Sequence, residues 1–185
     1  MMGLLLFRAV TAMERRWNYD ARYIRDVIAV SPWAGLRFLL ATSLGHGRRA
    51  PREAMAAAAL TATLAEDCGP CTQISVDMAL DRGVPPAILH AILIGDEAAM
   101  GDAAALGYRF ARAVLGHDIE GADPVREQIV QRWGPGALVD IGLTITVARM
   151  YPTLKYALGH GRSCSRVTVA GEPAAFHAGP GAVAA

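Results

Sequence analysis

Two cysteines, Cys68 and Cys71, are separated only by Gly69 and Pro70. Proline has a fixed φ and no N–H to donate, so it suits the first turn of a helix. We therefore expect a helix from Gly69 to about Arg82. Cys68 then precedes the first turn and Cys71 lies inside it, so both sulfurs can share one face, close enough to bond. The unpaired N–H groups and positive dipole end of such a helix favour thiolate over thiol, which predicts a redox-active pair.

Other interpretations of the cysteine pair stay open. The chain has three cysteines and no visible secretory signal, which disfavours a structural disulfide. A zinc site would need a second ligand pair, and the sequence contains no second Cys-x-x-Cys and no His-x-x-x-His. Two inert cysteines buried in a helix are the remaining alternative. We expect neither a metal nor a cofactor.

The composition favours an all-α fold. Hydrophobic residues make up 53% of the 185 residues but aromatic residues only 6%, so the core must be aliphatic and rich in alanine. We expect one helical domain over 1–160, in which 1–45 form an N-terminal helical extension, and a flexible tail over 161–185 that contains Cys164. The apolar fraction is high for this size and indicates a homo-oligomer. A net charge of +1 without a basic block predicts no nucleic-acid partner.

No membrane span is expected. The longest uncharged apolar run, 54–65, falls well short of the roughly 20 residues that a span requires, and Glu53 and Glu66 bracket it. The apolar start, 1–7, lacks a basic beginning and a small-residue cleavage site, so it reads as an amphipathic helix rather than a signal peptide. We therefore expect a cytoplasmic protein, in which a cysteine pair is more often catalytic than structural.

Periodicity, caps and prolines predict the individual helices. The expected helices cover 3–16, 21–30, 32–44, 52–66, 69–82, 87–94, 102–115, 124–133 and 135–151, and a short one covers 153–158. Ser31 is expected to cap the third helix, and Asp102 the seventh. The segments 96–101 and 117–122 are expected to be irregular. Apolar residues alternate in 135–151 as in a strand, but the length favours a helix that Pro152 ends.

The motifs together carry a family resemblance. An alanine-rich helix, the Cys-x-x-Cys pair, Val76-Asp77-Met78 and Gly83-Val84-Pro85 resemble the carboxymuconolactone decarboxylase / AhpD-like alkylhydroperoxidase superfamily. Trp133-Gly134 and the segment 138–159 resemble its C-terminal helix pair, so the resemblance covers about residues 50–160. It implies an all-helical domain that assembles as a dimer, trimer or hexamer.

The resemblance also implies a peroxidase cycle. By analogy, Cys71 would attack a hydroperoxide and become a sulfenic acid, and Cys68 would resolve it to a disulfide that a dithiol reductant restores. Family members carry a histidine four residues after the second cysteine, where this chain has Ser75. A hydroxyl can pass a proton along but cannot hold one near neutral pH. The candidate proton carriers are therefore Ser75, Glu53, Glu66 and His90.

Two further functions are compatible with the sequence. A helical oligomeric scaffold or small-ligand binder would keep the fold without turnover, and the serine at position 75 favours it. A decarboxylase or hydrolase acting on a lactone-like acid would not need the cysteine pair, so its presence argues against that activity. The leading prediction is a thiol-dependent oxidoreductase with a hydroperoxide, or another small molecule, as substrate.

Overall fold

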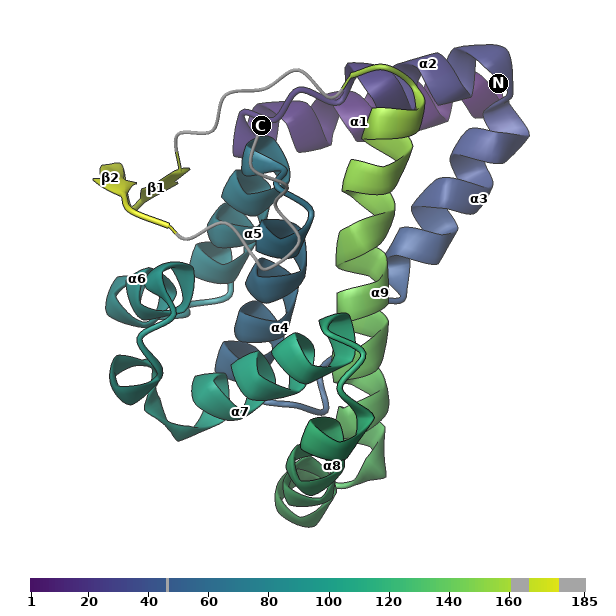
Figure 1. Cartoon of the computed structure of the whole chain (residues 1–185). Helices are drawn as coiled ribbons and strands as arrows, with labels where there is room; N and C mark the ends of the chain where they lie inside the picture. Colours follow the sequence, from purple (N-terminus) through teal and green to yellow (C-terminus); the bar gives the residue numbers. More distant parts are fainter. Residues whose placement is uncertain (46, 161–166, 177–185) are drawn as a thin grey trace.

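The computed structural model of the chain describes residues 1–45, 47–160 and 167–176, which are built almost entirely of α-helices (Figure 1). The helices are α1 (Met2–Trp17), α2 (Arg22–Val30), α3 (Pro32–Ser43), α4 (Arg52–Ala65), α5 (Gly69–Asp81), α6 (Pro86–Ile94), α7 (Glu97–Leu115), α8 (Ile119–Trp133) and α9 (Pro135–Ala157). An antiparallel ribbon of β1 (Val167–Val169) and β2 (Glu172–Ala174) follows. The predicted all-α class is confirmed. Cys164, which was expected in the tail, lies outside the described residues. None of the described helices is long and apolar enough to cross a membrane.

Helix α4 lies at the centre and contacts α5, α6, α7 and α9. Its many alanines leave little side-chain bulk between the helices, so neighbouring backbones can approach it closely. One such close approach is at Gly107 of α7, where an added Cβ would lie 2.3 Å from the carbonyl oxygen of Ala54. Leu60 packs into the core cluster on one side of α4 and Ala58 into the cluster on the other.

The first three helices form a third apolar cluster of their own, in which Ile24 and Ile28 of α2 are fully buried. Figure 1 shows α1 and α2 running crosswise to α9, and α3 returning beside it. The predicted cap of α3 is confirmed, because the Ser31 hydroxyl oxygen accepts the N–H of Ala34 and Pro32 occupies the first turn. The N-terminal segment is thus folded against α5 and α9 and helps to enclose the site described below.

Helix α9 confirms the helical prediction for 135–151, but the prediction that Pro152 ends it is wrong. The helix runs on to Ala157 with Pro152 buried inside it. A proline in a helix interior costs about 3 kcal/mol. Beyond the proline, Leu154 packs against the cluster of the first three helices, and the Tyr156 hydroxyl bonds the turn between α4 and α5. These tertiary contacts outweigh the local cost, so one long helix replaces the two that were expected.

Two segments expected to be irregular are partly helical. Helix α7 begins at Glu97, after Asp96 accepts the N–H of Ala99, and only Gly101, with φ 73°, leaves the helical conformation. Helix α8 begins at Ile119, where the Asp118 carboxylate accepts a backbone N–H. The Asp118 cap therefore starts α8 earlier than Asp123-Pro124 was expected to. In α7, Asp96 caps a short helical segment before the kink at Gly101, and the longer segment follows from Asp102, as expected.

Residues 167–176 form an ordered ribbon where the composition predicted a flexible tail. Val167 and Val169 are buried in the cluster around α4, α5 and α6. The side chain of Gln73 on α5 accepts the backbone N–H of Thr168 at 2.7 Å and donates to its carbonyl oxygen at 3.1 Å. The ribbon is held by the two buried valines and by the hydrogen bonds of the Gln73 amide. These contacts are made with other helices, so the composition of the segment does not reveal them.

Candidate dithiol site

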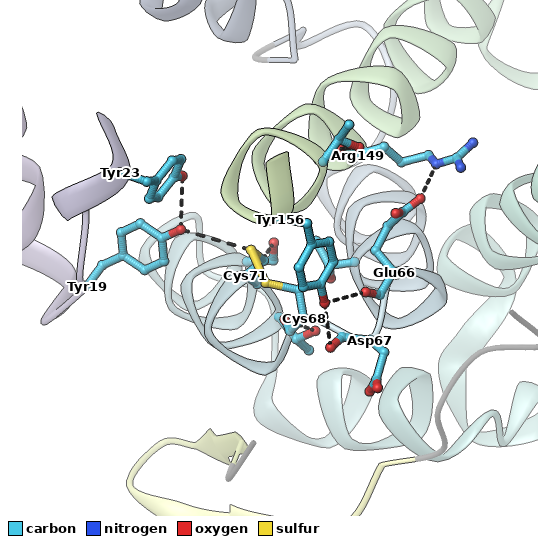
Figure 2. The surroundings of a disulfide bond; sticks show 12 residues. Tyr19, Tyr23, Glu66, Asp67, Cys68, Cys71, Arg149 and Tyr156 are labelled. Carbon is cyan, nitrogen blue, oxygen red and sulfur yellow. Dashed lines mark hydrogen bonds and ion pairs between the residues drawn. A yellow bond between two sulfur atoms is a disulfide. The ribbon is translucent and has the colours of Figure 1, made fainter. Parts of the chain in front are cut away.

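The cysteine pair lies where α4 turns into α5, as the Gly69-Pro70 signal predicted. Asp67 takes a left-handed conformation with φ 48°, which reverses the chain after α4, and Cys68 directly precedes α5. Cys68 and Cys71 are joined as a disulfide, with their Cα atoms 5.2 Å apart (Figure 2). The two sulfurs therefore share the first turn of α5, next to backbone N–H groups that favour negative charge on sulfur.

Both cysteines are shielded from bulk solvent, since each is only 2% exposed. A partly open cavity of about 260 Å³ reaches the pair, and Cys71 but not Cys68 is among the residues that line it. The two sulfurs are therefore inequivalent. A small molecule in the cavity would meet Cys71 first, with Cys68 behind it as the bonded partner.

The cavity walls come from α1, α3, α4, α5 and α9. Its surface is mainly apolar, with contributions such as Met13, Ile74 and Val147, and the charged residues in its described lining are Arg52 and Arg82. Cavities of this kind, apolar with a few placed polar groups, typically bind small organic molecules.

Tyr19 places a polar group next to the Cys71 sulfur. Its hydroxyl lies 3.9 Å from the Cys71 sulfur and 3.0 Å from the hydroxyl of Tyr23 (Figure 2). Burial raises the pKa of Tyr19 to about 12 and also raises the pKa of Tyr23. Both phenols therefore hold their protons at neutral pH. When Tyr23 donates to Tyr19, the Tyr19 hydroxyl is free to donate to the sulfur.

Lys155 places a positive charge behind this tyrosine. Its ammonium nitrogen lies 5.8 Å from the centre of the Tyr19 ring, and the residue is only 6% exposed. Burial lowers the pKa of the Lys155 ammonium group. A cation next to the ring of a donor phenol favours negative charge at the acceptor, which here is the Cys71 sulfur.

Ser75 is brought to the cavity wall but does not face the sulfurs. Its hydroxyl donates to the carbonyl oxygen of Cys71, one turn earlier in α5, at 2.9 Å. This bond occupies the only proton of the hydroxyl, so Ser75 stabilises the first turn of α5. In the structure the phenol of Tyr19, rather than Ser75, is the hydroxyl next to the Cys71 sulfur.

Glu66 precedes the pair in sequence, but its carboxylate turns away to an ion pair with Arg149 (Figure 2). Its backbone carbonyl accepts a hydrogen bond from the hydroxyl of Tyr156 at 2.9 Å, and the carbonyl of Asp67 accepts from the same hydroxyl at 3.0 Å. Tyr156 thus ties the turn before Cys68 to the end of α9, and Glu66 contributes to that anchor.

Glu53 and His90 are not among the described residues that line the cavity. Glu53 lies at the start of α4 in an ion pair with Arg52. Burial acts to raise the pKa of its carboxyl group, but hydrogen bonds from Arg52 and the backbone outweigh this effect, so the pKa lies below its usual value. A carboxylate held ionised in this way is a poor proton donor. His90 belongs to α6, which packs on α4, α7 and β1.

The sequence interpretation missed Tyr19 and Lys155. A tyrosine pair spaced i, i+4 at positions 19 and 23 was a weak signal, because such pairs usually pack in a core. Nothing in the order of residues relates positions 19 or 155 to position 71. Within the part of the chain that the structure describes, no group of three histidine, cysteine or acidic side chains is arranged to hold a metal ion.

Comparison with known proteins leaves the family unassigned. No family model matches the chain. No curated protein and no solved structure matches it significantly either.

Proposed function

We propose that this chain is a thiol-dependent oxidoreductase that reduces hydroperoxides through a Cys68/Cys71 dithiol–disulfide cycle. One observation carries the proposal: Cys71 lies at the wall of a partly open cavity, bonded to Cys68 on one side and within reach of the Tyr19 hydroxyl on the other. The sequence resemblance to AhpD-like alkylhydroperoxidases supports it.

The proposed cycle starts from the reduced pair. The Cys71 thiolate attacks the terminal oxygen of a hydroperoxide, so an S–O bond forms, the O–O bond breaks and the alkoxide leaves. The proton released by the thiol ends on the alkoxide, which departs as the alcohol. The Cys68 thiol then attacks the sulfenic sulfur, the S–S bond forms and water is lost. Two electrons pass from the pair to the peroxide, and a dithiol reductant returns them.

Tyr19 acts in this cycle as a hydrogen-bond donor rather than as a base. Its raised pKa keeps the phenol protonated, so it can stabilise the Cys71 thiolate and then the departing alkoxide. This role replaces the family histidine, for which the chain has Ser75. The reducing cytoplasm is the compartment in which such a cycle would be sustained.

Treatment of the reduced protein with one equivalent of cumene hydroperoxide tests the proposal. We expect mass spectrometry to show a loss of two hydrogens that maps to a Cys68–Cys71 disulfide, and dithiothreitol to reverse it. The same treatment without peroxide gives the background rate of air oxidation. If the pair stays reduced while a control thiol peroxidase is oxidised, the proposed function fails.

The Tyr19→Phe variant isolates the phenolic hydroxyl. Loss of one hydrogen bond to a thiolate removes about 1.5–3 kcal/mol of stabilisation, so we expect the Cys71 thiol pKa to rise and peroxide reduction at pH 7 to slow about tenfold or more. Alkylation rates measured against pH give the thiol pKa. Tyr156→Phe is the matched control, since its hydroxyl bonds carbonyl groups and not sulfur. Equal thiol pKa values in wild type and Tyr19→Phe would contradict this role.

A second candidate is a helical oligomeric scaffold or small-ligand binder. The observation that favours it is that Ser75 occupies the place of the family histidine, while neither Glu53 nor His90 is among the described residues that line the cavity. We propose a homo-oligomer in either case, because apolar side chains on α1 and α3, such as Leu4 and Trp33, are 64% exposed and a second copy would cover them. A scaffold would leave the cysteine pair unchanged in the peroxide experiment.

A further inference from the structure

Two neighbouring helices line the cavity along their length. On α5, the lining residues Cys71, Ser75, Met78 and Arg82 follow one another at intervals of one helical turn. This stripe starts at the reactive sulfur and ends at a guanidinium group. Arg82 follows Cys71 by eleven positions, which corresponds to about 16 Å along the helix.

Helix α4 repeats the pattern in the opposite direction. Its lining residues begin with Arg52, continue through Ala56 and Ala59, and end with Thr63. Arg52 donates from its guanidinium to the backbone carbonyl of Arg82 at 3.2 Å, so the start of α4 meets the end of α5. Figure 1 shows the two helices side by side. Both arginines therefore lie at the end of the cavity remote from the sulfurs.

This remote end has unbalanced positive charge. Glu53 pairs with Arg52, but the guanidinium of Arg82 has no hydrogen-bond or ion-pair partner among the described residues. Partial desolvation and the nearby charge of Arg48 lower the pKa of Arg82, whose side chain packs along the cavity wall but still reaches solvent. Arg52 and Arg82 are also solvent-exposed, so this end meets water while the rest of the wall stays apolar. A carboxylate matches such a guanidinium pair in both charge and shape.

We propose that the cavity takes a straight-chain carboxylic acid of medium length and that its hydroperoxide is the substrate. The carboxylate binds Arg52 and Arg82, the alkyl chain lies between α4 and α5, and the hydroperoxide at the far end of the chain meets Cys71. Successive bonds of about 1.5 Å advance a zigzag chain by about 1.25 Å each, so about thirteen bonds span the stripe, which corresponds to about twelve carbon atoms followed by the two peroxide oxygens. The substrate assignment rests on the proposed function; the binding of the acid does not.

Calorimetric titration of the full chain with decanoate tests the binding site without turnover. We expect decanoate to bind and decyltrimethylammonium, which has the same chain length and the opposite charge, to bind at least tenfold more weakly. Arg82→Ala and Arg52→Ala should each weaken decanoate binding about tenfold or more, because a hydrogen bond to a charged group is lost. Arg37→Ala is the matched control, since this exposed arginine of α3 does not line the cavity.

The outcomes separate the inference from the proposed function. If decanoate binds through the arginines but no hydroperoxide oxidises the cysteine pair, the anion site stands and the peroxidase proposal fails. If cumene hydroperoxide oxidises the pair but decanoate does not bind, or binds equally well to Arg82→Ala, the function stands and the inference is overturned. Equal affinity for decanoate and decyltrimethylammonium would also overturn it, because the arginines would then select nothing.

Discussion

Replacing Cys71 with serine should abolish hydroperoxide reduction, by on the order of 10³-fold or more, because a serine hydroxyl is not ionised near neutral pH and the nucleophile is lost. The structure favours Cys71 over Cys68 as the nucleophile, because Cys71 is the cysteine of the pair that lines the cavity. A steady-state assay coupled to dithiothreitol oxidation measures the change. Circular dichroism checks that the helices are retained.

The Cys68→Ser variant should behave differently. Cys71 can still attack the peroxide, so one turnover leaves a sulfenic acid with no thiol beside it to close the disulfide. We expect dimedone to label Cys71 in this variant after one equivalent of cumene hydroperoxide, and to label no cysteine of the pair in wild type. Cys164→Ser is the control for unspecific thiol oxidation and should cycle like wild type.

The opposite labelling pattern would contradict the assignment. If Cys71→Ser gave a sulfenic acid on Cys68 at the wild-type rate, the attacking cysteine would be the one that does not line the cavity. The peroxide would then reach the pair from the α4–α5 turn, where Tyr156 bonds the backbone. Full activity in both variants would remove the dithiol cycle altogether.

Local signals predicted most of the helical framework. Gly69-Pro70 and Ser31-Pro32 marked helix starts that the structure confirms, because a proline in the first turn depends only on its immediate neighbours. The same local rule failed at Pro152, inside α9. There the helix continues because Leu154 and Tyr156 contact segments that are distant in the chain, and the residues around 152 do not encode those contacts.

The candidate site was predictable only in part. The two cysteines lie within a single helical turn, so the spacing in the sequence was enough to predict that their sulfurs are close together. The groups around it come from distant parts of the chain: Tyr19 from the link between α1 and α2, and Lys155 from the end of α9. Conversely, Glu66 is close in sequence but faces Arg149. Which side chain meets the sulfur depends on how the helices cross, and periodicity carries no information on that.

The central position of α4 makes a second large effect measurable, this time on stability. Leu60 lies in the middle of this helix and is fully buried in its core cluster. The Leu60→Ala variant should lower the free energy of unfolding by about 2–5 kcal/mol, because it removes apolar contacts and leaves a cavity. Urea denaturation followed by circular dichroism gives this difference as a shift in the midpoint at unchanged slope.

Leu40→Ala is the matched control. Leu40 lies on α3 and is 60% exposed, so the same substitution should change the free energy of unfolding by no more than about 0.5 kcal/mol. Leucine and alanine have similar helix propensities, so the contrast isolates burial. The alanines of α4 each contribute little apolar volume, so the few large side chains of this helix must supply most of its contacts. A loss below about 1 kcal/mol for Leu60→Ala would mean that another helix organises the core. In that case the packing of α4 would not hold the α4–α5 turn that carries the cysteines.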